Sequence, residues 1–226
     1  MQVYNNPAMD EPDVQDQNRK FTRESAEFRR EALILATLDL IAEMGVRGAT
    51  VREIAARANV TQGLIRHYFS SKEELVQAAY EHHMNTLTDQ TAASSGTGSA
   101  VSQLTNFVDA SLRPPIVDPS AVALWAGFLN KVQNDPKMQR IHQQTYNYFR
   151  DHLEKLIVAA LQETGRSVAA SEATQLAIAC NAVIDGLWLE GGALPDAFSE
   201  GQLAQIGLDS VGAIVGIPLT KELEQP

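Results

Sequence analysis

The polar side chains with the clearest chemical use lie in the segment 61–67, between two stretches of apolar residues. A threonine hydroxyl and the free amides of a helix N-terminus bind phosphate, so Thr61 is suited to a phosphate contact. Gln62 can reach a base edge, and Gly63 lets the backbone approach DNA closely. Arg66 has two uses, because a guanidinium either reads guanine or holds a phosphate. The segment has the chemistry of a DNA-reading surface.

Two short helices joined by a tight turn are expected to present this segment. Thr50 begins the sequence Thr-Val-Arg-Glu, a capping box that predicts a helix at about 51–58. Asn59 tolerates a left-handed conformation, and Thr61 is a good N-cap for a second helix at about 62–69. This arrangement is a helix-turn-helix, whose second helix is free to lie in a major groove of DNA.

Helical periodicity continues along nearly the whole chain, because apolar residues recur three and four positions apart and no alternating strand pattern is present. The first helix is expected at about 25–44, ending at Gly45. A long helix is expected at about 71–91, and five more follow it at about 100–112, 119–134, 136–164, 171–193 and 199–215. A capping box at Ser199 is expected to begin the last of these. The pattern predicts an all-α fold of about nine helices, with a three-helix, helix-turn-helix domain near the N-terminus.

The distribution of charge matters more for DNA binding than the net charge of −10. Residues 1–18 hold four acidic and no basic side chains, residues 19–72 hold six acidic and ten basic ones, and the remainder holds eighteen and eight. Most of the surface would repel phosphate, which excludes non-specific coating of nucleic acid by the whole molecule. We expect residues 1–24 to be a mobile acidic arm with a basic end, residues 25–72 to form the helix-turn-helix domain, and residues 73–226 to form a second helical domain whose first helix connects the two.

Several other classes of protein lack support in the sequence. Cys180 is the single cysteine, which excludes an intramolecular disulfide; we expect it to be a small buried residue. No stretch approaches ~18 uninterrupted apolar residues and the N-terminus is polar and acidic, so a cytoplasmic protein with no membrane partner is expected. His82 and His83 point about 100° apart on a helix, so no metal site is expected. No phosphate-binding loop or nucleophile motif is present, and we expect no enzyme activity and no cofactor.

The segment from Thr50 to Lys72, Thr-Val-Arg-Glu-Ile-Ala-Ala-Arg-Ala-Asn-Val-Thr-Gln-Gly-Leu-Ile-Arg-His-Tyr-Phe-Ser-Ser-Lys, resembles the DNA-binding domain of the TetR family of transcriptional repressors. The resemblance covers about residues 28–84. It implies a homodimeric, all-helical repressor that binds a double-stranded DNA operator, with a C-terminal domain for dimerisation and for a small-molecule inducer. By this resemblance the expected DNA contacts are Thr50, Arg52, Thr61, Gln62, Gly63, Arg66, His67, Tyr68 and Lys72.

The resemblance gives these residues roles, and the sequence departs from it in places. Thr50 and Lys72 match phosphate contacts of the family, and its recognition-helix contacts are matched by Thr61, Gln62, Gly63, Arg66, His67 and Tyr68. Arg66 stands where the family usually has tyrosine, and Asn59 stands where it usually has glycine. The segment that begins at His67 also departs from the usual pattern, and a solvated surface histidine is the alternative role for that residue. These departures leave the expected docking of the second helix on DNA unchanged, but the operator sequence does not follow from the resemblance.

Three further features resemble the betaine-pathway repressor (BetI) branch of the family: the segment 65–69, Trp125, and the segment 185–189. This resemblance suggests a cationic quaternary amine such as choline as inducer, because aromatic faces and carboxylates bind such cations. The candidate ligand contacts are Trp125, Phe128, Tyr146, Phe149, Asp185 and Trp188. Two alternatives stay open: the aromatic residues pack as an ordinary core, and Asp185 binds across a dimer interface or faces water.

Two helices expected near the C-terminus carry apolar stripes, formed by Leu176, Ala179, Val183, Leu187 and by Leu203, Ile206, Val211, Ile214. In the TetR family such helices pair with those of a second copy, and Gly207, Gly212 and Gly216 would permit a close approach. An intramolecular helix pair needs the same stripes, so dimerisation follows from the resemblance alone.

The sequence leaves two alternative functions open. A ligand-independent activator or architectural DNA-binding regulator would have the same helix-turn-helix but a solidly packed aromatic cluster. An enzyme or a module that does not bind DNA would use the helical scaffold for a different site.

Overall fold

A computed structural model of the chain describes the backbone of residues 14–221 and the side chains of residues 26–221. Within the described residues the structure has nine α-helices, one short 3-10 helix and no strand, so the all-α prediction is confirmed. The helices are α1 (Val14–Gly48), α2 (Val51–Arg57), α3 (Gln62–Tyr68), α4 (Lys72–Ser94), α5 (Ala100–Ser111), α6 (Pro119–Asn134), α7 (Pro136–Glu163), α8 (Ala170–Ala193) and α9 (Gln202–Val215).

Two helix starts differ from the sequence-based expectation. α1 begins at Val14 rather than near residue 25, so the expected start of the first helix is wrong, whereas the mobility of the arm stays a prediction. Residues 14–24 contain neither glycine nor proline, so nothing in the backbone stops the helix. The acidic residues 10–13 lie outside the described residues, so the acidic part of the arm stays a prediction. α9 begins at Gln202 rather than 199, because Gly201 takes a left-handed φ of 75° directly before it.

Most helix ends follow the capping signals in the sequence. Gly45 takes a φ of 73° and ends the regular part of α1, as expected. The Thr50 hydroxyl accepts a hydrogen bond from the Glu53 amide at 3.3 Å. The Glu53 carboxylate, however, makes no reciprocal bond: its Oε1 lies 3.4 Å from Arg52, and its buried Oε2 has no partner. The capping box therefore acts through its threonine alone.

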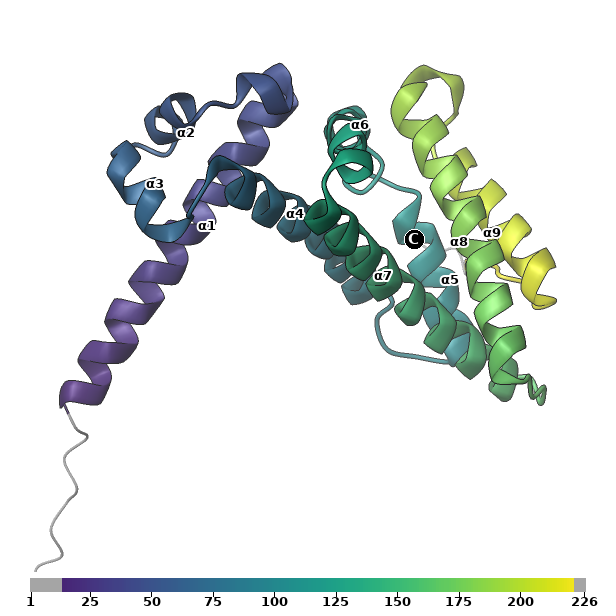
Figure 1. The fold of residues 1–226 in the computed structure, drawn as a ribbon. Helices are drawn as coiled ribbons and strands as arrows, with labels where there is room; N and C mark the ends of the chain where they lie inside the picture. The colour runs from purple at the N-terminus through teal and green to yellow at the C-terminus, as the bar shows by residue number, and fades with distance from the viewer. Residues whose placement is uncertain (1–13, 222–226) are drawn as a thin grey trace, which may run out of the picture.

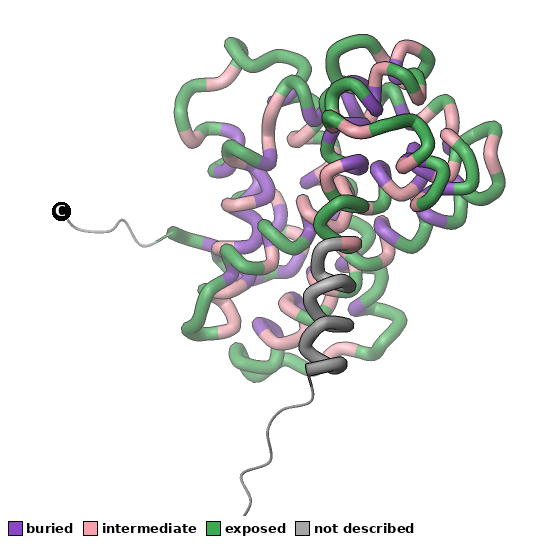
Figure 2. Tube along the Cα trace, turned by 90° about the vertical axis from the view of Figure 1, so that its left-hand side faces the viewer, coloured by how far each residue is buried: buried purple, intermediate pink, exposed green. Residues whose placement is uncertain are grey.

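The molecule has two hydrophobic cores. The first joins α1, α2, α3 and the start of α4 to α6 and the start of α7. The second lies among α5, α7, α8 and α9. Figure 1 shows α2 and α3 at one end, α8 and α9 at the other, and α4 beside α7 between them. Figure 2 shows the buried residues in purple along the chain. The helix-turn-helix therefore shares its core with helices of the C-terminal region, and the boundary at residue 72 stays a prediction.

Phe128, one of the six candidate ligand contacts, belongs to the first core and does not line the cavity described below. Its side chain is fully buried, and its ring lies 4.8 Å from that of Tyr80. Trp125, one helical turn earlier on α6, lines the cavity described below. Aromatic spacing alone could not separate these two environments, because residues three apart on a helix share a face but reach different neighbours.

The glycines of α9 serve packing inside the chain, contrary to the role suggested for them at a dimer interface. A Cβ at Gly207 would lie 2.1 Å from Leu112 Cδ1, and one at Gly212 would lie 2.9 Å from the Ile217 carbonyl oxygen. Leu203 and Val211, from the predicted stripe, are also buried in the second core. The close approach that these small residues permit is intramolecular.

By length and composition, α8 is the one helix among the described residues that could cross a membrane. Core helices of globular proteins pass the same test, and α8 packs against α6, α7 and α9. Cys180, on this helix, is buried as expected, and burial raises the pKa of its thiol to about 11.

Removing the Phe128 ring should show that it is part of the core. We expect Phe128→Ala to lower the free energy of unfolding by ~3–5 kcal/mol, because the cavity left between α4 and α6 cannot collapse fully. Phe128→Leu, which keeps most of the apolar volume, should lose a smaller share. Urea unfolding followed by circular dichroism measures both; a loss under ~1 kcal/mol for the alanine variant would contradict the assignment.

Candidate functional site

The α3 helix separates a buried face from an exposed polar face. Ile65 and Phe69 are each 2% exposed and anchor the helix in the first core. On the opposite face Gln62, Arg66 and His67 are exposed, as sequence reasoning predicted for a recognition helix. Thr61 and Gly63, at the N-terminus of the helix, are exposed too, whereas Tyr68 is half-buried and meets the His67 ring edge-on at 5.2 Å. The exposed face thus carries the side chains of Thr61, Gln62, Arg66 and His67 and the backbone of Gly63.

The turn before α3 has the conformation that the sequence predicted. Asn59 takes a φ of 53°, and the Val60 amide donates to the Ala55 carbonyl oxygen at 2.9 Å. The Thr61 hydroxyl accepts from the Leu64 amide at 3.3 Å and caps the helix. A Cβ at Gly63 would meet nothing closer than Thr61 Oγ1, at 3.7 Å. The fold does not require glycine there, so its small size is available to a partner.

Two cations hold the helix-turn-helix to the end of α1. The Arg57 guanidinium binds both carboxylate oxygens of Glu43, at 2.9 and 2.6 Å. Lys72 Nζ donates to the Val46 carbonyl oxygen at 2.9 Å, and burial lowers the pKa of its ammonium group. An ammonium has three donors, so this predicted phosphate contact keeps donors for another acceptor. Thr50 and Arg52, the other predicted contacts outside α3, are exposed.

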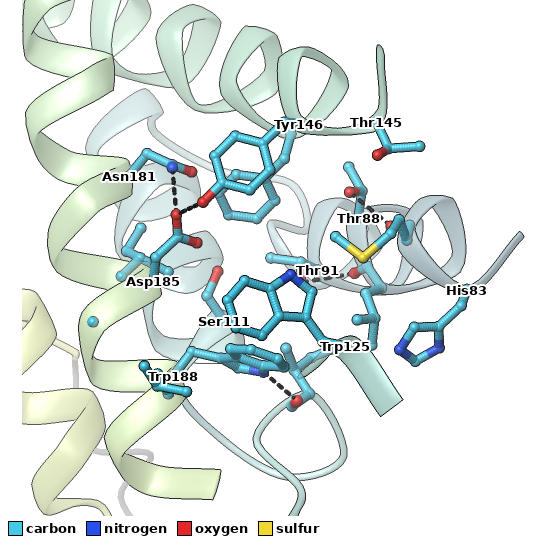
Figure 3. Close-up of a pocket in the computed structure, with 17 residues that line it drawn as sticks. His83, Thr88, Thr91, Ser111, Trp125, Thr145, Tyr146, Asn181, Asp185 and Trp188 are labelled. Carbon is cyan, nitrogen blue, oxygen red and sulfur yellow. Dashed lines mark hydrogen bonds between the residues drawn. The ribbon is translucent and has the colours of Figure 1, made fainter. Parts of the chain in front are cut away.

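A cavity of about 230 Å³ lies between α4, α5, α6, α7 and α8 (Figure 3). Five of the six predicted ligand contacts line it: Trp125, Tyr146, Phe149, Asp185 and Trp188. The two tryptophan rings meet edge-to-face, with centroids 5.8 Å apart. Trp188 is oriented by its indole nitrogen, which donates to the Ile116 carbonyl oxygen at 2.8 Å. The cavity wall is therefore mainly apolar and aromatic.

Asp185 is the acidic side chain of this wall, and no lysine or arginine is among the lining residues. Its Oδ2 accepts from the Tyr146 hydroxyl and, at 2.7 Å, from Asn181 Nδ2. Burial raises the pKa of Asp185, and the two hydrogen bonds oppose that rise. Burial and the Asp185 carboxylate both raise the pKa of Tyr146, so its hydroxyl stays a donor. The arrangement places a hydrogen-bonded carboxylate against aromatic faces, an environment suited to an organic cation.

His83 lines the cavity, and sequence reasoning missed it. Its Nε2 is buried with no hydrogen-bond partner, and burial together with the neighbouring His82 lowers its pKa to about 4. The ring is therefore neutral at physiological pH. In Figure 3 it lies on the far side of Trp125 from Asp185. The sequence pair His82-His83 was the available signal, but it was assessed for metal binding; the described residues contain no group of three metal-ligating side chains.

The other missed lining residues are small, polar or aliphatic. They are Met84, Leu87, Thr88, Thr91, Ser111, Ile116, Thr145, Asn181, Ile184, Gly186 and Leu189. The sequence feature that could have predicted this wall is the pair Thr88 and Thr91, because both are polar and lie one turn apart on one face of α4.

Comparison with known proteins matches both ends of the chain. The model of bacterial regulatory proteins of the tetR family matches residues 33–79, and that of the BetI-type transcriptional repressor C-terminal domain matches residues 100–216. The HTH-type transcriptional regulator BetI of Burkholderia lata is 31% identical over 172 residues, covering 73% of this chain and 82% of the relative.

Solved structures show the same fold. A transcriptional regulator of Pseudomonas aeruginosa PAO1 has a TM-score of 0.75 and 31% identity, covering 84% of this chain and 91% of that one. A regulator of Saccharomonospora viridis, solved in complex with choline, has a TM-score of 0.65 and 20% identity, covering 80% and 93%.

The neutral His83 should make folding sensitive to acid. The unfolded chain takes up this proton near pH 6.5 and the folded chain near pH 4, so the unfolded state binds more protons between these values. Stability contributed by His83 is therefore lost as the pH falls through this window. We expect His83→Phe to lose less unfolding free energy than the wild type between pH 7 and 4.5, measured by urea unfolding. His82→Gln is the control on the same helix; equal pH slopes for wild type and His83→Phe would refute the prediction.

Proposed function

Because the chain belongs to the TetR family of transcriptional regulators and has a BetI-type C-terminal domain, we propose that it is a homodimeric repressor released from its operator by a small organic cation. The observation that carries the proposal is the course of α4. This helix starts at Lys72, beside the helix-turn-helix, and its residues 83–91 form one wall of the cavity. A ligand that moves this wall acts on the element that supports α3.

DNA recognition is assigned to the exposed face of α3. Gln62, Arg66 and His67 would face base edges in a major groove, while Thr61 and the amides at the helix N-terminus would hold a phosphate. Thr50, Arg52 and Lys72 would anchor neighbouring phosphates. A dimer would place two such helices on the halves of a near-palindromic operator.

A choline-like cation fits the chemistry of the cavity. Aromatic faces attract quaternary ammonium groups, and Asp185 supplies the compensating charge in a wall with no lysine or arginine. The likeness in fold to a regulator solved with choline supports trying choline first. The cavity also argues against the ligand-independent alternative, for which the aromatic cluster would be packed solid.

Dimerisation is assigned to the exposed face of α8 together with α9. Ile178 is 46% exposed, Leu189 is 42% exposed and Ile206 is 37% exposed. Between the first two, Ala182 and Gly186 continue the exposed face of α8, with Asp185 at the edge of this face where Gly186 and Leu189 also line the cavity. Such a mainly apolar stripe fits an interface with a second copy and accounts for the high hydropathy of α8.

The proposed mechanism is a shift between two dimer geometries. The unliganded geometry fits the half-site spacing of the operator, and the liganded geometry does not. The ligand must then bind the second geometry more tightly, and DNA must weaken ligand binding by the same factor. A cytoplasmic location follows from the function.

The direct test selects bound duplexes from a random DNA pool, with and without choline chloride. We expect an enriched near-palindrome whose binding is weakened by choline, and the same palindrome without choline sensitivity for Asp185→Asn. Enrichment that choline leaves unchanged in the wild type would remove choline as inducer but keep DNA binding. A pool with no enriched sequence would contradict the proposed function.

Arg66 provides the residue-level test of DNA reading. If its guanidinium is bidentate to guanine, Arg66→Ala should weaken binding to the selected duplex by ~1–3 kcal/mol and binding to a random duplex far less. Fluorescence anisotropy at one fixed salt concentration measures both affinities. Lys155→Ala, which removes an exposed cation from α7, is the control. An equal loss on both duplexes would instead assign Arg66 to a phosphate.

A further inference from the structure

We propose that Asp185, Tyr146, His142 and Tyr80 form a continuous path that couples the cavity to the core of the helix-turn-helix, with the Tyr80–His142 hydrogen bond as its positioning contact. The inference rests on the proposed function, because it says how the two ends of that mechanism communicate. Its members come from α8, α7 and α4, and every link is a direct contact.

The path begins inside the cavity. The Tyr146 hydroxyl and Asn181 Nδ2 donate to the same oxygen of Asp185. A cation drawn to this carboxylate competes with the Tyr146 hydroxyl for it, and the Tyr146 ring itself lines the cavity. Occupation of the cavity therefore acts on Tyr146 in two ways, through its hydroxyl and through its ring.

The second link runs along α7 and across to α4. His142 lies four residues before Tyr146, on the same face of the helix, with the two ring centroids 5.1 Å apart. His142 Nδ1 lies 2.6 Å from the Tyr80 hydroxyl, and the two rings are stacked at 6.1 Å. Burial lowers the pKa of His142 and so favours the neutral ring. A neutral ring can accept a hydrogen bond from the Tyr80 hydroxyl at Nδ1. A displaced Tyr146 ring shifts His142 and with it this acceptor.

The last link lies in the first core. Tyr80 is fully buried, packs on Phe128 at 4.8 Å, and shares its core with Ile65 of α3. A buried hydroxyl without a partner is unfavourable, so Tyr80 must follow His142 or lose its hydrogen bond. Because the core is closely packed, there is no free volume around the ring, and a shift of Tyr80 moves α4 relative to α1 and α3.

A second tyrosine bond between the same two helices provides a matched control. The Tyr148 hydroxyl of α7 donates to Asp89 Oδ1 of α4 at 2.7 Å, but Tyr148 is 38% exposed and lines neither the cavity nor the first core. Tyr80→Phe and Tyr148→Phe therefore remove the same group from the same helix pair, one on the path and one off it.

The chain also contains a reporter at one end of the path. Its two tryptophans, Trp125 and Trp188, both line the cavity, so intrinsic tryptophan fluorescence reports on the cavity alone. Coupling between two sites is reciprocal, so operator binding at the other end must change the cavity if the path exists. The experiment therefore needs no inducer.

The test titrates the full-length protein with the selected operator duplex and, as baseline, with a random duplex, while tryptophan emission is recorded. We expect the operator to change the wild-type emission beyond the baseline, Tyr148→Phe to keep this change, and Tyr80→Phe to lose more than half of it at saturating duplex. An unchanged wild-type emission, a full response in Tyr80→Phe, or an equal loss in Tyr148→Phe would each overturn the path.

Two measurements keep these outcomes distinct. Circular dichroism melting verifies that each variant is folded, and His142→Phe, which removes the acceptor but keeps a ring beside Tyr146, takes the place of Tyr80→Phe if the latter does not fold. Operator affinity is measured in parallel by anisotropy. Failure of the wild type to bind any selected duplex refutes the proposed function and the path with it, whereas normal operator binding with an unaffected Tyr80→Phe response refutes the path alone.

Discussion

The burial of Tyr80 constrains the rest of the structure. Its ring fills the core that α1, α3 and α6 share, and its hydroxyl reaches out of this core to α7. A polar group in that position must keep its hydrogen bond, and an aromatic ring in close packing cannot move independently of its neighbours. The helix-turn-helix therefore packs in one core with α6 and the start of α7.

The cavity reflects a balance between apolar burial and one charge. Two hydrogen bonds to one oxygen stabilise the buried carboxylate of Asp185, although burial still raises its pKa. At the other side of Trp125, His83 keeps a buried ring nitrogen without a partner. Unsatisfied and strained polar groups gather at functional sites, since a ligand can satisfy them. The wall thus carries polar groups that the second core lacks, because the buried members of that core are aliphatic apart from Phe107 and Cys180.

The helix α3, proposed to read DNA, differs from the cavity in this respect. Its buried face carries the energy of folding through Ile65 and Phe69, while its exposed side chains make no hydrogen bond within the described residues that would hold them. Arg66 and Gln62 are thus available to a partner. Arg57 and Lys72 instead bind groups at the end of α1 and hold the helix-turn-helix against it.

Local signals in the sequence determined the helices, the turn and the exposed face of α3. Capping threonines, the left-handed Asn59 and Gly45, and apolar spacing act over a few residues. The order of residues from Thr50 to Lys72 is by itself typical of the TetR family. The tertiary structure alone decided which aromatic residue lines the cavity and which fills a core, as Trp125 and Phe128 show. It also brought His83 to the cavity and Tyr80 to His142, 62 positions away in the chain. The physical reason is that helical periodicity specifies the face on which a side chain lies, whereas the packing of distant helices determines what that face meets.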